Sequence, residues 1–374
     1  VSVDPVGSNA LAFSVLCAGG AIRVTVTTTG RDRDFDGYVV TGTTVGFTNT
    51  VRVGPASTGV VGSFPVGATV QVTLGDLAPN CTATGAPFSV TVVLNDPVNL
   101  AVPVTCAAAP SSAILVGTAS GNGIFRYFPG APGTFQSIGT GEEPRWAPGG
   151  TGFAFVDGGL LKLADVDAGT IRSLDGSGSA PAYSPDPRRL LFLQFDCFFG
   201  CYFPNEIYYV DPASPTFAPA VALPAPDVTA FDVSPTTGAV AYISGNQGIA
   251  FEAYELRTAN ADGSGVRVLL TGRNPGGPDL KPRFSPNGQE LFLQRECPTG
   301  SQPCIYIVRT DGTPPRVLDV RFRPLDWSPD GTRLLVVNAT SPGVALSLIS
   351  ATTGQVVETL GNAPAQVLSA TWRR

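Results

Sequence analysis

One short phrase recurs six times between residue 144 and the end of this 374-residue chain. Each copy has a small or polar residue, an aromatic or apolar residue, and then Ser-Pro-Asp-Gly or a degenerate form of it. The copies begin at Pro144 (PRWAPGG), Pro181 (PAYSPD), Phe231 (FDVSPTTG), Pro282 (PRFSPNG), Leu325 (LDWSPDG) and Ser369 (SATWRR). A repeat of about 40–50 residues containing several short strands is typical of a β-propeller.

The residue before each turn is aromatic in five of the six copies, and all three tryptophans of the chain occupy this position. The six residues are Trp146, Tyr183, Val233, Phe284, Trp327 and Trp372, spaced 37, 50, 51, 43 and 45 apart. We expect them to pack between neighbouring sheets, because stacked sheets need buried side chains where they meet. The Ser-Pro-Asp-Gly segment predicts a turn between the first two strands, with proline presetting φ and glycine accepting a positive φ.

Each repeat contains four predicted strands. In two successive repeats they begin at Pro282, Glu290, Ile305 and Pro315, and at Leu325, Arg333, Ala345 and Val356. Residues 113–138 supply three further strands without a phrase, whereas the last phrase supplies a first strand and then the chain ends. We therefore predict that the C-terminal strand completes a sheet with 113–138 and closes a six-bladed propeller over residues 113–374, removing two open sheet edges.

The Ser-Pro-Asp-Gly phrase and its spacing resemble the propeller repeats of the TolB-like family. The resemblance covers residues 113–374. It implies a propeller that serves as a platform for protein contacts, since members of the family act as interaction platforms or accessory domains. It implies no reaction, because one fold hosts many functions.

The first hundred residues show strand-like alternation of a different kind. Alternating segments begin at Ala21, Gly37, Thr69, Phe88 and Asn99, and turn residues separate them. This pattern predicts an immunoglobulin-like β-sandwich over residues 20–108. A small-residue segment that contains proline predicts a linker at 109–112, so the whole chain is expected to be all-β.

Residues 1–19 contain a copy of the last predicted sandwich strand. Asp-Pro-Val occurs at 4–6 and again at 96–98, and each copy leads into an alternating segment that ends in Cys17 or Cys106. The alternating residues of the first copy are Leu11, Phe13 and Val15. One interpretation is an outer strand of the same sandwich or a remnant of a lost repeat. The other is a strand donated to a neighbouring copy of the chain, which would build a filament if the contact does not close into a ring.

The composition excludes several classes of function. With no histidine, the chain cannot assemble a Ser-His-Asp triad, a Cys-His pair or a histidine-ligated metal site. Only 14% of residues are charged, the net charge is −6, and the two lysines are Lys162 and Lys281, so nucleic acid is not an expected partner. No run of 18 apolar residues predicts a membrane span. Few charges permit self-association.

Carboxylate chemistry remains possible without histidine. A hydrolase in the propeller channel would need two converging carboxylates, and no spacing in the sequence brings two together. The candidates are Asp196, Glu206, Glu252, Glu255 and Glu296. We therefore expect a protein that is not an enzyme.

Seven cysteines indicate an oxidising compartment. The expected disulfides are Cys81–Cys106, Cys197–Cys201 and Cys297–Cys304; zinc binding is the alternative, but the spacings are not CxxC. Cys17 is left over and is a candidate for an intermolecular bond. The absence of methionine, including at position 1, agrees with removal of a secretion signal. We expect an extracellular or cell-surface location, with the periplasm as the alternative.

The segment Asp32-Arg-Asp34-Phe-Asp36-Gly37 matches the start of a calcium loop, in which alternate carboxylates face one cation. Thr43 occupies the twelfth position, where an EF-hand has a bidentate glutamate. An acidic, solvated turn is the alternative. Calcium is the only cofactor that the sequence suggests.

Together these features predict a non-enzymatic, secreted or cell-surface structural protein that assembles with copies of itself. The alternative is a monomeric propeller that binds another surface protein or a glycan at one face.

Overall fold

The computed structural model describes residues 19–94, 97–109, 113–119, 123–128, 134–194, 206–223, 225, 228–245, 254–272, 281–298, 303–338 and 345–373. Regular structure in these ranges is β throughout, and none of it forms a helix long and apolar enough to cross a membrane. Two compact units make up the chain. The first comprises the residues up to Thr29, Gly37–Leu77 and Cys81–Thr105, and the second comprises Gly30–Asp36, Ala78–Asn80 and Cys106–Arg374. Two segments inside the predicted sandwich therefore belong to the second unit.

The first unit is built from two four-stranded sheets, with strand orders β4-β1-β8-β6 and β3-β2-β5-β7. The strands are β1 Gly19–Gly30, β2 Tyr38–Thr44, β3 Phe47–Val53, β4 Thr58–Pro65, β5 Thr69–Gly75, β6 Cys81–Ala83, β7 Phe88–Thr91 and β8 Val98–Cys106. Alternate residues of β1, beginning with Ile22 and Val24, are fully buried, as a strand with one covered face requires.

The two sheets lie face to face. A Cβ added at Gly42 of β2 would lie 2.7 Å from Phe64 Cζ and 3.2 Å from Val61 Cγ1, both on β4 of the other sheet. The sequence did not predict β3, β4 or β6. Glycine, threonine and serine make up much of β3 and β4, and many of their residues are exposed, so alternation of apolar residues is weak there.

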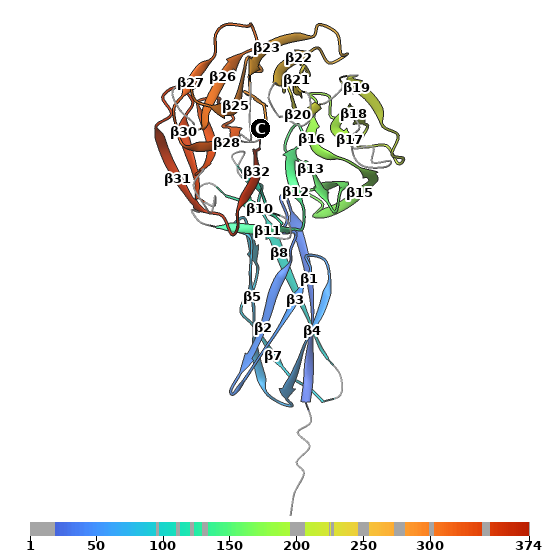
Figure 1. Cartoon of the computed structure of the whole chain (residues 1–374). Helices are drawn as coiled ribbons and strands as arrows, with labels where there is room; N and C mark the ends of the chain where they lie inside the picture. Colours follow the sequence, from blue (N-terminus) through green and yellow to red (C-terminus); the bar gives the residue numbers. More distant parts are fainter. Residues whose placement is uncertain are drawn as a thin grey trace, which may run out of the picture. The chain divides into compact units, whose positions relative to one another are not determined.

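The second unit contains six four-stranded sheets among the described residues (Figure 1). Five of them use four consecutive strands each, and in each of these five the first strand in sequence lies at one edge. Their strands are β12 Glu142–Trp146, β13 Gly152–Asp157, β14 Leu160–Asp165, β15 Thr170–Ser177; β16 Ser179–Tyr183, β17 Leu190–Gln194, β18 Glu206–Val210, β19 Ala220–Leu223; β20 Val228–Val233, β21 Val240–Gly245, β22 Tyr254–Ala259, β23 Arg267–Gly272; β24 Arg283–Phe284, β25 Glu290–Glu296, β26 Pro303–Arg309, β27 Arg316–Leu318; β28 Phe322–Trp327, β29 Arg333–Asn338, β30 Ala345–Ser350 and β31 Val356–Asn362. Figure 1 shows the sheets arranged around a common centre, which is the arrangement of a β-propeller.

The remaining sheet joins the two ends of this unit. Its strand order is β11-β10-β9-β32, with β9 Ile114–Thr118, β10 Ile124–Tyr127, β11 Phe135–Gly139 and β32 Val367–Trp372. Strand β32 pairs antiparallel with β9, and Trp372 lies opposite Ile114. The pairing predicted for the C-terminal strand is therefore present, and it joins the first and the last described strands of the second unit in one sheet.

The Ser-Pro-Asp-Gly phrase forms the turn between the first two strands of a sheet. Ser328 follows β28 and its N–H donates to the carbonyl of Arg333, at the start of β29, at 2.9 Å. Inside this turn the Ser328 hydroxyl donates to Asp330 Oδ1 at 2.5 Å, and Thr332 N donates to the same oxygen at 3.0 Å. Side-chain bonds of this kind hold the backbone in a tight turn.

Apolar side chains pack where neighbouring sheets meet. Trp327 is fully buried and its ring lies 6.0 Å from that of Phe292 in the preceding sheet. Phe284 packs in a cluster with residues of β21 and β25. Trp146 and Trp372 belong to similar clusters, and Tyr183 is partly buried against another. The aromatic residues of the phrase therefore lie between sheets.

Candidate functional site

Charged side chains on or beside the edge strands β12, β20 and β24 meet across the ring. Asp232 on β20 forms ion pairs with Arg145 on β12 and with Arg283 on β24, the latter at 3.3 Å. Lys281, just before β24, lies 3.4 Å from Glu143 on β12, three sheets away in chain order. The six edge strands β12, β16, β20, β24, β28 and β32 each contact the next one in this order, and β32 contacts β12, so they line the ring axis; we call them the inner strands.

Two inner-strand aspartates also fasten neighbouring sheets to each other. Asp232 accepts a hydrogen bond from Phe284 N at 2.8 Å, and Asp326 accepts one from Trp372 N at 2.7 Å. Both aspartates are buried, being 2% and 1% exposed. Each carboxylate therefore satisfies a backbone N–H of the next inner strand in the ring, which a buried strand edge requires.

A cavity of about 280 Å³ lies at the carboxyl ends of the inner strands. Its walls come from the repeated phrase in several sheets. The lining includes Trp146, Pro148, Tyr183, Pro185, Val233 and Trp372, together with Arg145 and Asp326. We call it the aromatic cavity.

Two hydrogen-bond donors of the aromatic cavity are unused. Trp146 Nε1 and Trp372 Nε1 are buried and make no hydrogen bond within the described part of the chain. By contrast, Trp327 Nε1 donates to the Arg283 carbonyl at 3.0 Å. Burial raises the pKa of Tyr183 well above its ordinary value of 10.0, so its hydroxyl stays protonated at neutral pH. A buried N–H without a partner is unfavourable, and an acceptor within hydrogen-bond distance of it would satisfy it.

The sequence pattern assigned these aromatic residues to packing alone. Packing accounts for Trp327 and Phe284, but Trp146, Tyr183 and Trp372 also face the aromatic cavity. A sequence signal separates the two groups in part. Two of the cavity residues, Trp146 and Trp372, stand in degenerate copies of the phrase, WAPGG and TWRR. Trp327, which does not line the cavity, begins the intact copy WSPDG.

The acidic segment at 32–36 has a different environment from a calcium loop. Asp32 is fully buried, and its two carboxylate oxygens lie 2.9 and 3.0 Å from Arg373 Nη1. Ala109 N donates to Asp32 Oδ2 at 2.7 Å, and Arg126 Nη1 lies 3.6 Å from Oδ1. Nitrogen donors thus occupy positions that a cation would need, and the contacts favour an ion cluster over the calcium hypothesis.

Asp34 is held in the same way and is also fully buried. It accepts hydrogen bonds from Gln136 Nε2 and from Ala78 N, the latter at 3.1 Å. Burial lowers the pKa of Arg126 to about 10, although the carboxylates of Asp32 and Asp34 act in the opposite direction. The guanidinium therefore remains charged at neutral pH. Neither alternative drawn from the sequence, a cation loop or a solvated turn, anticipated this buried cluster.

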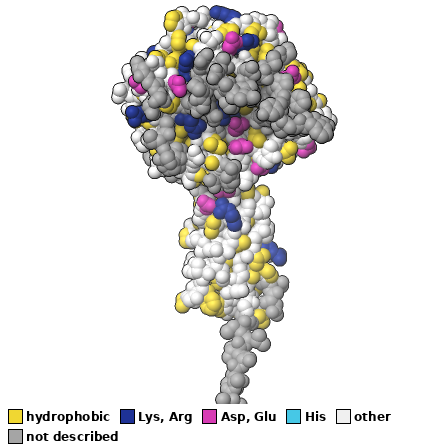
Figure 2. All heavy atoms as spheres, in the orientation of Figure 1, with side chains coloured by type: hydrophobic (Ala, Val, Ile, Leu, Met, Phe, Trp, Pro, Cys, Tyr) yellow, Lys and Arg dark blue, Asp and Glu magenta, His cyan; other side chains and the backbone are white. Residues whose placement is uncertain are grey.

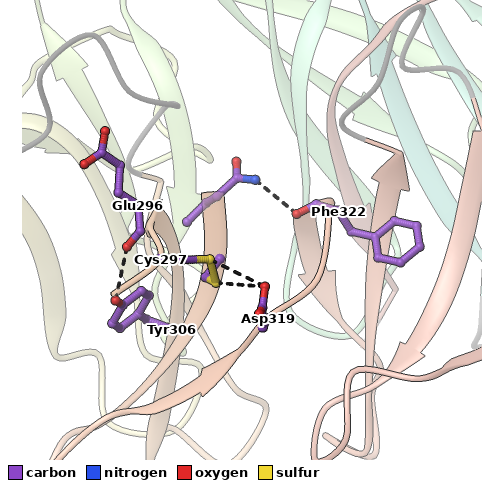
Figure 3. The surroundings of a disulfide bond; sticks show 7 residues. Glu296, Cys297, Tyr306, Asp319 and Phe322 are labelled. Carbon is purple, nitrogen blue, oxygen red and sulfur yellow. Dashed lines mark hydrogen bonds between the residues drawn. A yellow bond between two sulfur atoms is a disulfide. The ribbon is translucent and has the colours of Figure 1, made fainter. Parts of the chain in front are cut away.

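The disulfide expected at Cys297–Cys304 is present, with the two Cα atoms 5.0 Å apart (Figure 3). It joins the end of β25 to β26, and Asp319 Oδ1 lies 3.7 and 3.6 Å from the two sulfurs. Cys81 and Cys106 are each disulfide-bonded. Cys17, Cys197 and Cys201 lie outside the described residues, as do Leu11, Phe13 and Val15 of the candidate assembly strand.

The carboxylates considered for a hydrolase do not meet on the axis within the described ranges. Glu206 begins β18 and Glu255 lies on β22, both third strands of their sheets, and Glu296 ends β25. Glu206 accepts a hydrogen bond from Tyr208, and Glu255 pairs with Arg257. Asp196 and Glu252 lie outside the described residues.

Comparison with known proteins identifies the fold. Neither a protein-family model nor a curated protein matches the sequence. A chain in the crystal structure of the nidogen/laminin complex matches with a TM-score of 0.53 at 13% identity, covering 70% of this chain and 98% of that one. TolB from Acinetobacter baumannii matches with a TM-score of 0.56 at 16% identity, covering 83% of this chain and 80% of TolB.

A third solved structure, an oligogalacturonate lyase in complex with manganese, matches with a TM-score of 0.47 at 14% identity over 66% of this chain and 73% of the lyase. That likeness is too remote to carry an argument. At these identities the first two likenesses show the fold alone. The described part of the chain is all-β and contains a β-propeller whose fold is similar to that of TolB.

Proposed function

We propose that this chain is a non-enzymatic binding scaffold, in which the aromatic cavity of a six-bladed propeller holds a segment of a partner protein. The observation that carries the proposal is the aromatic cavity with its two unpartnered indole N–H donors. Aromatic walls and proline rings receive an apolar side chain, while the indoles donate to backbone carbonyls of the bound segment. In this proposal the first unit is an immunoglobulin-like sandwich.

The size of the aromatic cavity favours a side chain over a larger ligand. At about 280 Å³ it lies at the lower limit of small-molecule pockets, which are roughly 300–1,000 Å³. Outermost strands of several sheets also expose β-branched residues: Ile171, Val221, Val268, Val317 and Val356. On the face drawn in Figure 2, basic and acidic side chains are scattered among neutral ones. Such a surface supports contact with protein, and one of the structures with this fold is a protein complex by its title.

The engaged carboxylates support a role as a non-enzymatic scaffold, and the disulfides support a location outside the cytoplasm. The buried carboxylates of the axis, Asp232 and Asp326, are engaged by arginine side chains or backbone N–H groups. Disulfides persist in oxidising compartments. The extracellular space or cell surface is therefore proposed as the location, with the periplasm as the alternative.

Tryptophan fluorescence tests the proposal directly, since two of the three tryptophans line the aromatic cavity. The full chain is probed with arrays of proline-rich and aromatic peptides and with a glycan array; hits are titrated by tryptophan fluorescence in the native chain, and by the anisotropy of a dye-labelled peptide in the native chain and in every variant. We expect peptide hits to perturb the emission, and Trp146→Phe with Trp372→Phe to weaken binding about tenfold by removing both donors.

Trp327→Phe is the matched control, because Trp327 is buried away from the cavity with its Nε1 already bonded. It should keep full affinity. Unchanged peptide affinity in the double cavity variant would contradict the proposal. Hits confined to oligosaccharides would replace the protein partner with a glycan.

A second proposal concerns residues 1–18. Their sequence copies β8, a strand that lies between β1 and β6 in its sheet and buries Val102, Val104 and Cys106. A segment with the same alternation has the pattern needed to occupy an equivalent place in another molecule's sandwich. We propose that residues 1–18 occupy this place in the sandwich of a neighbouring copy, and that Cys17 forms a disulfide with a cysteine of that copy.

Deletion of residues 1–18 tests strand donation. Native and truncated chains are compared by analytical ultracentrifugation and negative-stain microscopy, and Cys17→Ser by non-reducing electrophoresis. The truncated chain should be monomeric, and Cys17→Ser should lose covalent dimers. Polymers formed by the truncated chain would rule out strand donation and leave the cavity proposal intact.

A further inference from the structure

The turn between β2 and β3 carries the most exposed large hydrophobic side chain among the described residues. Thr44 and Phe47 form the last pair of the two strands, so the turn itself consists of Val45 and Gly46. Val45 is 95% exposed and Phe47 is 47% exposed. A Cβ added at Gly46 would meet nothing within 4 Å, so this turn projects from the rest of its unit. We call residues 44–47 the hairpin tip.

The structure of the turn does not account for the apolar residues of the hairpin tip. Two-residue hairpin turns favour Asn-Gly or Asp-Gly, so Val45 stands where a polar residue is usual. Farther along β2, Tyr38 and Val40 point into the sandwich and are fully buried. Val45 and Phe47 have no such place in the core. Single exposed apolar residues are common on protein surfaces, but two on one projecting turn indicate a contact site.

The hairpin tip offers the groups that the aromatic cavity lacks. The backbone carbonyls of Val45 and Gly46 lie outside the paired register of β2 and β3, so they are available as acceptors. Trp146 Nε1 and Trp372 Nε1 are the donors of the cavity that have no partner in the described part of the chain. Acceptors on a turn with apolar side chains therefore suit a cavity with apolar walls and buried donors.

The volume of the aromatic cavity suits the two side chains of the hairpin tip. An apolar cavity of about 150 Å³ holds benzene, which has the size of the Phe47 ring. The aromatic cavity measures about 280 Å³, so it has room for this ring and for Val45. The hairpin tip carries no charge, and the charged lining residues Arg145 and Asp326 already have partners within the second unit.

We propose that the hairpin tip of one copy of the chain enters the aromatic cavity of another copy. This inference rests on the proposed function of the cavity and names the chain itself as the partner. A charged fraction of only 14% permits copies to approach one another. Because the tip and the cavity are different surfaces, the contact is heterologous, and it links copies into a ring or an open chain.

The proposed contact is small, which determines its strength. Small interfaces belong to weak or transient complexes, so we expect a dissociation constant of about 10–100 µM. Strand donation by residues 1–18 is tested at about 1 µM, where a contact of this strength contributes little. Concentration therefore separates the two kinds of self-association.

A synthetic peptide tests the contact on the full chain. The probe is a cyclised, dye-labelled peptide with the sequence of residues 40–51, and its binding is followed by anisotropy. The cavity variant, Trp146→Phe with Trp372→Phe, should bind the peptide about tenfold more weakly than the native chain. A peptide without the two tip side chains (Val45→Ser, Phe47→Ser) should not bind.

Mixing two variants tests whether the partner is a second copy. Both chains lack residues 1–18, so that strand donation does not contribute. The tip variant, Val45→Ser with Phe47→Ser, keeps an intact cavity, and the cavity variant keeps an intact tip. In sedimentation at about 100 µM each variant alone should be largely monomeric. Their mixture should form a one-to-one complex that does not extend further.

Val60→Ser with Val356→Ser is the matched control, because these valines are 49% and 51% exposed on β4 and β31. The control chain should associate like the native one. Association retained by the tip variant, or a mixture that stays monomeric, would overturn this inference even if the cavity binds other peptides. A cavity that binds no peptide at all would overturn the proposed function as well.

Discussion

At the scale of single residues, Asp32 shows how far a side chain's role depends on its surroundings. It lies in a segment with alternate aspartates, yet it is fully buried beside Arg373 and Arg126. Arg126 in turn donates to the Asp32 and Arg33 carbonyls at 3.1 and 3.2 Å. The carboxylate therefore pairs with two buried guanidinium groups, and its removal leaves uncompensated charge.

We predict that Asp32→Asn lowers the free energy of unfolding by about 3–5 kcal/mol, the usual effect of breaking a buried ion pair. Asp76→Asn is the control, because Asp76 forms an exposed ion pair with Arg52 and should lose less than about 1 kcal/mol. Both aspartates have positive φ, which asparagine tolerates, so backbone strain is matched. Urea unfolding measures the difference, and equal losses in the two variants would contradict the cluster's role.

Calcium gives a further test at the same residue. If the guanidinium groups are the partners of Asp32, chelation with EDTA leaves the unfolding midpoint of the native chain unchanged. A midpoint that rises with added calcium, and fails to rise in Asp32→Asn, would restore the calcium interpretation.

At the scale of elements, the phrase turns show how a local hydrogen bond tunes a carboxylate. The Ser328 hydroxyl, followed by Thr332 N, lowers the pKa of Asp330 to about 2. Asn287 occupies the equivalent place in another sheet, where its Oδ1 accepts from the Ser285 hydroxyl at 2.7 Å. The turn therefore forms with or without the charge, and the charge adds a dependence on pH.

We predict that Asp330→Asn flattens the acid limb of the stability curve. Because the folded pKa of Asp330 lies below its unfolded value, its contribution is complete above about pH 4 and is lost as the pH falls toward 2. The carboxylate is exposed, so the loss at pH 7 is at most about 1 kcal/mol. Unfolding measured from pH 2 to 7 should show the two curves meeting near pH 2. Asn287→Asp should steepen the same limb; parallel curves for all three chains would contradict the prediction.

At the scale of the whole molecule, ring closure depends on one strand from the end of the chain. Strand β32 contributes Val367, Ala370 and Trp372 to the core shared with β28–β31, and its pairing with β9 covers Ile114 and Val116. The last sheet of the ring thus combines segments separated by more than 200 residues.

We predict that deletion of residues 366–374 abolishes cooperative unfolding of the second unit. Loss of a buried tryptophan alone costs about 3–5 kcal/mol, and net stabilities are only about 5–15 kcal/mol. Calorimetry and dye binding to exposed apolar surface measure the effect. A synthetic peptide spanning 364–374, added to the truncated chain, should restore the transition. A truncated chain that unfolds like the full one would show that closure contributes little.

Local pattern determined much of this architecture. The strands predicted from Glu290, Arg333 and Ala345 begin at those residues in the structure, because their apolar runs are bounded by turn residues that leave no alternative register. The phrase turns and the pairing of β32 also followed from spacing. Strands β3 and β4 did not, since short polar side chains carry little alternation.

Only the tertiary structure decided what the polar groups do. The cluster at Asp32 joins residues 32, 109, 126 and 373, and the aromatic cavity joins 146, 183 and 372; no local pattern relates such positions. Strand periodicity is a property of neighbours along the chain and is visible in the sequence. Charge balance, unpartnered donors and cavities are properties of neighbours in space, and they exist only once the ring has closed.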